Sequence, residues 1–204
     1  PIGGTVFAEV AIFSGVGLVM AKYPSLVIAS HQAAMNFSNL MYAFPLSISS
    51  AMAIIISYEF GARRMDAVKS YSKLGRLTAL GFSIFTLIFL YFLRYDLAEL
   101  YGHETEFLRM TAIFMTYSLF FQVADVFAAP LQGILRGYKD TKVPFYLGVL
   151  AYWGITFPVG FLLEKVTGLG PYSYWIGLIA SLIVSGLCYQ WRLNKIVKRY
   201  ESQP

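Results

Sequence analysis

The sequence is poor in charge and in cysteine. Only 13% of its 204 residues are Asp, Glu, Lys or Arg, whereas a soluble domain carries about 25%. Cys188 is the single cysteine, so a disulfide-stapled scaffold is excluded. Intrinsic disorder is also excluded, because 57% of the residues are hydrophobic and the mean hydropathy is +0.60. These values indicate a chain whose solvent is lipid.

Long apolar runs fill the sequence instead. A bilayer core about 30 Å thick needs about 20 apolar residues per crossing helix, and six runs supply that length. They cover residues 3–21, 26–58, 73–93, 107–135, 143–163 and 172–191. The second run is too long for one straight crossing, and Pro45 in its middle predicts a kink. The sequence therefore predicts an all-α, polytopic membrane protein, a single lobe of six transmembrane helices over residues 1–204, with residues 192–204 as a cytoplasmic tail.

The positive charges lie between these runs and predict the orientation. Twelve of the sixteen Lys and Arg residues follow the second, fourth and sixth runs. Because Lys and Arg concentrate on the cytoplasmic side, we expect both ends of the segment to face the cytoplasm. The same topology explains the net charge of +5, so nucleic-acid binding is not expected. The chain starts at Pro1 without a polar lead-in, and we expect it to belong to something longer.

Two acidic residues, Glu9 and Asp125, lie inside apolar runs. A carboxylate at bilayer depth costs about 2.5 to 3.5 kcal/mol on insertion scales, so each one predicts a functional site. Asp125 lies eleven residues before Arg136, which is about 16 Å along a helix. Glu9 lies at least eight residues, or about 12 Å along a helix, from the expected cytoplasmic start of its own run. We therefore expect both carboxylates near the middle of the bilayer.

Polar stripes on two helices support this expectation. Ser118, Gln122, Asp125 and Gln132 share one helical face. Gln32, Asn36 and Asn39 repeat the same spacing in the second run. Together with Glu9, the two stripes predict a wet cavity inside the bundle. The alternative is that the amides only hydrogen-bond neighbouring helices.

His31 also lies inside an apolar run and has two interpretations. A histidine titrates near neutral pH and could join a proton path, but a helix-packing histidine is the more frequent case. Enzymes are not expected. The sequence has no phosphate-binding glycine loop, no pair of His at metal-ligand spacing and no second intramembrane Asp for an aspartyl protease. Neither a cofactor nor a metal is expected beyond Na⁺ at Glu9 and Asp125.

Three segments resemble one transporter family. They are PIGGTVFAEVAIFS at the start, ASHQAAMNFSNLMYAFPLSISSAMAIIISYEFGARR, and FFQVADVFAAPLQGILRGYKDTKVPFYLGVLAYWGITFPVGF. The most specific part runs from Asp125 through LQGILRGYKDTKVP. These segments resemble the C-terminal half, helices seven to twelve, of the multidrug and toxic compound extrusion (MATE) transporters. The resemblance is to the bacterial norfloxacin-type branch, and it implies one lobe of a two-lobe fold in a bacterial cytoplasmic membrane.

The resemblance also implies a function. Such transporters are secondary antiporters that export cationic, amphipathic compounds in exchange for Na⁺ or H⁺. Glu9 and Asp125 match the acids of the seventh and tenth helices that form a cation site. Phe121 stands where some members have a Tyr, which puts an aromatic hydroxyl ligand in doubt. Ser118, Phe121, Gln122, Gln32, Asn36 and Asn39 are the expected substrate cavity.

Several alternatives stay open at this point. Na⁺ and H⁺ both suit a Glu and Asp pair, and the exported compounds and the oligomeric state are undetermined. The chain could instead be a non-transporting membrane interaction module, or a half-transporter that needs a partner lobe. An ion channel is a further alternative. A lipid-linked oligosaccharide flippase is disfavoured, because it would need basic residues at mid-bilayer depth to hold pyrophosphate.

Overall fold

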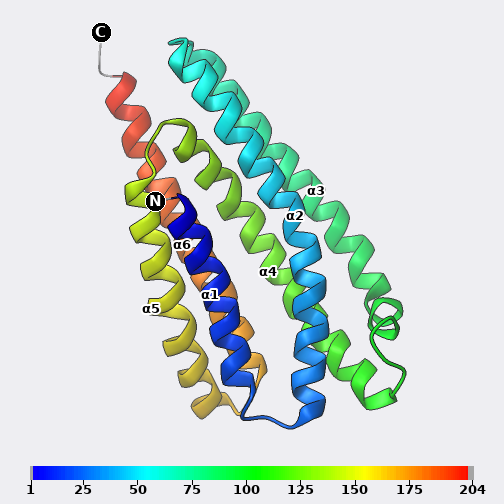
Figure 1. The fold of residues 1–204 in the computed structure, drawn as a ribbon. Helices are drawn as coiled ribbons and strands as arrows, with labels where there is room; N and C mark the ends of the chain where they lie inside the picture. Colours follow the sequence, from blue (N-terminus) through cyan, green and yellow to red (C-terminus); the bar gives the residue numbers. More distant parts are fainter. Residues whose placement is uncertain (1, 202–204) are drawn as a thin grey trace.

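The computed structural model describes residues 2–201, and six helices account for nearly all of them (Figure 1). Their bounds are α1 Ile2–Met20, α2 Ser25–Gly61, α3 Met65–Glu99, α4 Thr105–Gly137, α5 Lys142–Thr167 and α6 Tyr172–Glu201. Each of α2 to α6 contains an apolar stretch long enough to cross a membrane. The apolar part of α1 over its described side chains, Phe7–Met20, is shorter. The predicted all-α fold with membrane-crossing helices is confirmed.

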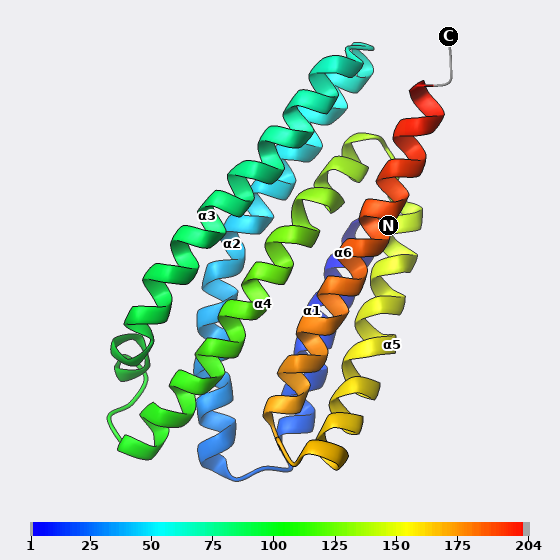
Figure 2. The same cartoon turned by 180° about the vertical axis from the view of Figure 1, so that it is seen from behind.

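The six helices run alternately up and down around α4. Helix α4 packs against α2, α3 and α6, whereas α1 packs against α5 and α2. Figure 1 shows α1 in front, and Figure 2 shows α3, α4 and α6 side by side from the opposite side. Most residues of the second half of α4 are buried. Helix α4 is therefore the core of the lobe, with neighbours on three sides.

Two helices extend further than the sequence predicts. Helix α3 begins at Met65 instead of residue 73, and α6 continues to Glu201, so residues 192–201 of the expected tail are helical. The added segments are rich in Lys, Arg, Ser and Tyr, which hydropathy does not count as membrane-spanning. A helix satisfies its own backbone hydrogen bonds and has no need to stop at the membrane surface. Helix α2 runs unbroken through Pro45.

Glycines bring helix backbones into direct contact. A Cβ atom at Gly133 would lie 2.1 Å from the carbonyl oxygen of Ser49, and one at Gly137 would lie 2.5 Å from Cβ of Ile56. Gly133 and Gly137 form the small-xxx-small spacing that lets membrane helices approach closely. Between α5 and α6, a Cβ at Gly177 would lie 2.4 Å from the carbonyl oxygen of Thr156. Close contact between α4 and α2 therefore depends on two missing side chains.

A polar cluster joins the turn between α1 and α2 to α5 and α6. Lys22 Nζ lies 2.6 Å from a carboxylate oxygen of Glu164 and donates to the hydroxyl of Tyr174 at 3.1 Å. The hydroxyls of Tyr23 and Tyr174 also donate to Glu164. Partial burial opposes the charged form of Lys22, but its hydrogen bonds to Glu164 and Tyr174 prevail and raise the pKa of the ammonium. This cluster fixes the end of α1 opposite the basic loops.

Replacing Gly133 is predicted to destabilise the lobe. In Gly133→Ala the new methyl group meets backbone, which cannot rotate away, and overpacking of this kind costs about 1 to 3 kcal/mol. For a chain of this size we expect a melting temperature lower by about 3 to 10 °C in detergent. Gly154→Ala is the matched control, because nothing lies within 4 Å of its Cβ position. Equal melting of the two variants would contradict the close α2 to α4 contact.

Candidate functional site

The carboxylate of Glu9 is the point where four helices meet. Glu9 lies on α1, and it accepts hydrogen bonds from Tyr42 of α2 at 3.0 Å, Gln132 of α4 at 3.1 Å and Tyr152 of α5 at 3.1 Å. Its first oxygen accepts from Gln132 and Tyr152, and its second accepts from Tyr42. Hydrogen bonds to a carboxylate are stronger than those between neutral groups, and three donors offset part of the cost of removing this charge from water.

Asp125 lies beside Glu9 in the same cavity. The cavity has a volume of about 20 Å³, and both carboxylates line it together with Tyr42, Tyr152 and Ser181. Space of this size suits about one water molecule or ion. The side chain of Asp125 is only 6% exposed, and no described residue offers a hydrogen bond to its Oδ2 atom. A buried carboxylate oxygen without a partner is rare, and it marks a position that a cation or a proton would satisfy.

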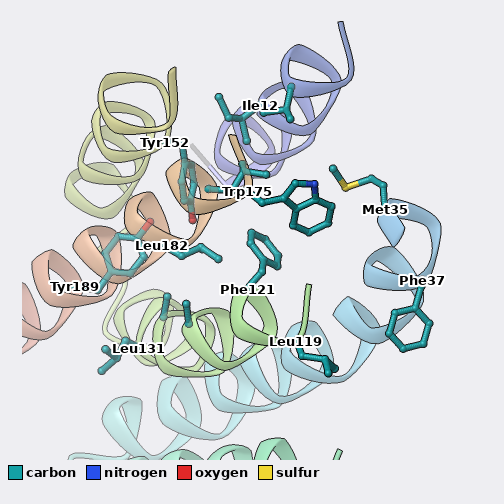
Figure 3. Close-up of a cluster of buried hydrophobic side chains, with 14 of the residues drawn as sticks. Ile12, Met35, Phe37, Leu119, Phe121, Leu131, Tyr152, Trp175, Leu182 and Tyr189 are labelled. Carbon is teal, nitrogen blue, oxygen red and sulfur yellow. The ribbon is translucent and has the colours of Figure 1, made fainter. Parts of the chain in front are cut away.

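Apolar side chains enclose this polar cavity. Ile12 of α1, Phe121 of α4 and Leu182 of α6 line it, and Figure 3 shows these three side chains on their separate helices. Phe121 packs edge-on against Phe13 at a centroid distance of 5.4 Å and against Trp175 at 6.4 Å. An apolar wall excludes water and strengthens the electrostatic interactions between the groups inside. Phe121 is thus a wall of the site and contributes no polar ligand to it.

A chain of hydrogen bonds leads from Glu9 toward the basic end of the lobe. Gln132, which donates to Glu9, accepts a hydrogen bond from the guanidinium of Arg136. Arg136 also lies 3.5 Å from the hydroxyl of Ser49 on α2. Arg136 fixes the orientation of the Gln132 amide. The carbonyl oxygen of Gln132 accepts from Arg136, and its amino group is left to donate to Glu9. A positive charge therefore lies two hydrogen bonds away from the carboxylate pair.

The structure buries the predicted polar stripe of α4. Ser118, Gln122, Asp125 and Gln132 are all buried, so the prediction that this face avoids lipid is confirmed. Gln122 donates to the hydroxyl of Thr86 on α3 at 3.3 Å, and Ser118 donates to the carbonyl oxygen of Met115 at 2.8 Å. The hollow beside Ser118, Phe121 and Gln122 measures only about 10 Å³. A drug-sized compound needs at least about 300 Å³, so these three residues do not hold one in this arrangement.

The polar stripe of α2 lies elsewhere than predicted. Gln32, Asn36 and Asn39 share one face, but this face is exposed on the outside of the lobe. They line a shallow hollow of about 380 Å³, in which the hydroxyl of Tyr101 donates to Asn36 at 3.2 Å. The prediction of a cavity inside the bundle is wrong for this stripe. Most buried residues of α2 are small or apolar instead, and they pack against α4.

His31 lies among aromatic rings. Its side chain is 1% exposed, and its Nδ1 atom accepts a hydrogen bond from the indole nitrogen of Trp175 at 3.1 Å. The rings of Phe114 and Trp175 pack edge-on against the imidazole at centroid distances of 5.9 and 5.8 Å. No described group bonds to its Nε2 atom, and it is not among the residues that line the Glu9 cavity. This geometry favours the packing interpretation.

Sequence reasoning missed three members of the site. Tyr42 and Tyr152 supply hydroxyls to Glu9, and Arg136 orients Gln132. The chain has fifteen Tyr, and most Tyr in a membrane protein are expected to contact lipid or the membrane interface. No feature of the neighbouring sequence distinguishes Tyr42 and Tyr152 from the others. The spacing of Gln132 and Arg136, four residues apart on one helix, was a usable signal for their contact.

The MatE family model matches residues 1–162 of this chain. The chain belongs to the MATE family. A probable multidrug resistance protein NorM of Streptococcus pneumoniae (strain R6) is 68% identical over 202 residues, which are 99% of this chain and 45% of that protein. A probable multidrug resistance protein NorM of Bacillus subtilis (strain 168) is 44% identical over 203 residues, which are 100% of this chain and 45% of that protein.

A solved MATE structure has the same fold. The crystal structure of the eukaryotic MATE transporter AtDTX14 superposes with a TM-score of 0.86 at 18% identity, over 93% of this chain and 43% of that chain. This MATE chain spans less than half the length of the curated relatives it matches. The family, its multi-pass membrane nature and the correspondence to the C-terminal half of a MATE transporter are thus all shown, as the sequence predicted.

The pair of His31 and Trp175 yields a stability prediction. In His31→Phe the indole N–H loses its acceptor, and leaving a buried donor unpaired costs about 1 to 3 kcal/mol. We expect lower melting temperatures for His31→Phe and for Trp175→Phe, and a smaller than additive loss in the double variant. Melting in detergent measures all three. Additive losses in the double variant would contradict the packing interpretation.

Proposed function

We propose that this chain is a lobe of a secondary active multidrug antiporter. It exports cationic, amphipathic compounds in exchange for Na⁺ or H⁺, and Glu9 and Asp125 form the cation site. The observation that carries the proposal is the shared cavity, where Glu9 has three donors and one oxygen of Asp125 has none. Family membership supports the same function, because relatives over 99% of this chain bear the name multidrug resistance protein.

The chemistry of the site follows from two like charges in one small cavity. Two carboxylates at close range repel each other, and a cation or protons between them relieve that repulsion. The relief is larger where water is excluded, so ligand affinity changes whenever a movement of helices opens or closes the cavity. A coupling ion and a cationic compound then compete for the same negative charge. Antiport results from the different affinities of the two arrangements for each ligand.

The compound itself needs a larger space than this cavity. The exposed stripe of Gln32, Asn36 and Asn39 on α2 offers amide donors and acceptors on a face that stays exposed in the described part of the lobe. We assign this face to the wall of a substrate cleft that a second lobe completes. A lobe that spans 45% of its relatives leaves room for such a partner, from the same polypeptide or from another copy.

Neutralising the carboxylates is predicted to abolish export. The test uses the natural polypeptide that carries these residues, reconstituted in vesicles with ethidium or norfloxacin and an imposed Na⁺ or pH gradient. We expect Asp125→Asn and Glu9→Gln to lose at least about tenfold in export rate, since removal of a charge at the ion site costs at least about 1.4 kcal/mol. Glu106→Gln is the matched control, because Glu106 lies exposed on the same helix as Asp125.

The outcomes of this experiment separate the candidate functions. Unchanged export in Asp125→Asn would contradict the assignment of the site. Wild-type protein that is inserted but moves no compound under either gradient would favour a non-transporting interaction module. Drug-independent ion conductance would indicate a channel.

Ion binding at the site is predicted to stabilise the protein. If Na⁺ is the coupling ion, saturation at about 100 times its dissociation constant adds about 2.7 kcal/mol. We expect Na⁺ to raise the melting temperature by about 5 to 10 °C over K⁺ or choline at equal ionic strength. Asp125→Asn should remove the difference, and Glu106→Gln should keep it. Equal melting in all three salts would assign the coupling to H⁺ instead.

A further inference from the structure

A long groove runs between α3 and α6, on the side of the lobe shown in Figure 2. The two helices both pack against α4 but scarcely touch each other, so a strip of α4 forms the floor of the groove. Its volume is about 980 Å³. Sites for small molecules range from about 300 to 1,000 Å³, so this groove is large enough for a ligand of lipid size.

Positive charge lines one end of the groove. Lys69, Lys73 and Arg76 follow one another at spacings of four and three residues, which places them on one face of α3. Lys198 of α6 lines the opposite wall. None of the groove's lining residues that the structure describes is acidic. The basic end lies where the loop between α2 and α3 and the end of α6 leave the apolar segments.

At the other end the α3 and α4 surfaces of the groove are apolar, and Gln190 of α6 adds an amide to the opposite wall. Leu77 and Leu80 continue the same face of α3 toward the middle of the bundle, and Val123 and Phe127 of α4 form the floor beside them. Leu80 and Phe127 are 49% and 39% exposed, so their surfaces are open to an apolar ligand. Along α3 and α4 the groove therefore changes from basic to apolar, in the order in which a phospholipid changes from headgroup to acyl chain.

The groove faces away from the ion site. Val123 and Phe127 each lie two residues from Asp125, and two residues correspond to about half a turn of an α-helix. They are thus on the side of α4 opposite Asp125. The groove also carries charge of the wrong sign for the cationic compounds of the proposed transport reaction. It is separate from both the ion site and the exposed stripe of α2.

We propose that this groove is a specific binding site for an anionic phospholipid, such as phosphatidylglycerol. Lys73, Arg76 and Lys198 hold the headgroup phosphate, and the acyl chains lie along Leu80 and Phe127. Basic pockets between membrane helices near the membrane surface bind anionic headgroups in this way. A protein segment in the groove would have to bring carboxylates to offset the charges of Lys73, Arg76 and Lys198, which it would take out of water. A lipid supplies its phosphate at the interface, where water still reaches it.

The test counts lipids retained by the purified protein. The natural polypeptide that carries this lobe is equilibrated in detergent with equimolar phosphatidylglycerol and phosphatidylcholine, and bound lipids are resolved by native mass spectrometry. We expect preferential retention of phosphatidylglycerol. Each cation near the membrane surface contributes about fivefold to the affinity, so the triple variant Lys73→Gln, Arg76→Gln, Lys198→Gln should bind about 100-fold more weakly.

Two further variants separate this site from general electrostatics. Lys139→Gln, Lys142→Gln and Lys195→Gln together remove the same charge from the same end of the lobe, outside the groove, and should retain the preference. Val123→Trp changes no charge but fills the floor, and it should reduce phosphatidylglycerol retention at least about fivefold. Melting in detergent verifies that every variant is folded.

Four results would overturn the proposal. Equal retention of the two lipids would show only an apolar surface, and equal losses in the two triple variants would show only diffuse attraction. Displacement by millimolar inorganic phosphate would show a phosphate site without lipid specificity. The absence of any retained lipid would show that another part of the polypeptide covers the groove. Each of these results leaves the proposed antiport function intact, because that function depends on Glu9 and Asp125.

Discussion

The interaction on which the lobe depends is the set of hydrogen bonds to the carboxylate of Glu9. Helix α1 has few other polar contacts with the bundle, and this carboxylate accepts one bond from each of α2, α4 and α5. Lipid cannot replace a lost donor, so these hydrogen bonds favour the meeting of the four helices at this point. The same bonds leave the neighbouring Asp125 without a partner for one oxygen. Cohesion and the proposed cation site thus depend on one arrangement.

Helix α4 connects the separate features of the lobe because it presents different chemistry in different directions. Its polar face carries Asp125 and Gln132 toward α1, and its glycines at positions 133 and 137 admit the backbone of α2. Its third face, with Val123 and Phe127, forms the floor of the groove between α3 and α6. A helix that packs against α2, α3 and α6 transmits movement from each of them. A shift of α2 along its glycine contact would therefore change the cavity of Asp125 directly.

The two ends of the lobe are stabilised by different means. At one end, the cluster of Lys22, Glu164 and Tyr174 ties the turn between α1 and α2 to α5 and α6. At the other end the basic residues are spread along α3 and α6, and an ion pair of Arg192 with Asp140 at 2.6 Å joins α6 to the turn after α4. The helices are thus closely tied at the first end and more widely separated at the second, where the groove opens.

Much of this protein is determined by its sequence alone. Six apolar runs determine the number of helices, and the cost of a carboxylate in lipid singles out Glu9 and Asp125, since both are effects of single residues or of local composition. The tertiary structure alone decided which helix faces are buried and which residues from different helices meet. Spacing shows that Gln32, Asn36 and Asn39 share a face, but only the packing of α2 against α4 determines that this face is outside. Tyr42 and Tyr152 join the site for the same reason, because their hydrogen bonds to Glu9 link residues 33 and 143 positions apart in sequence.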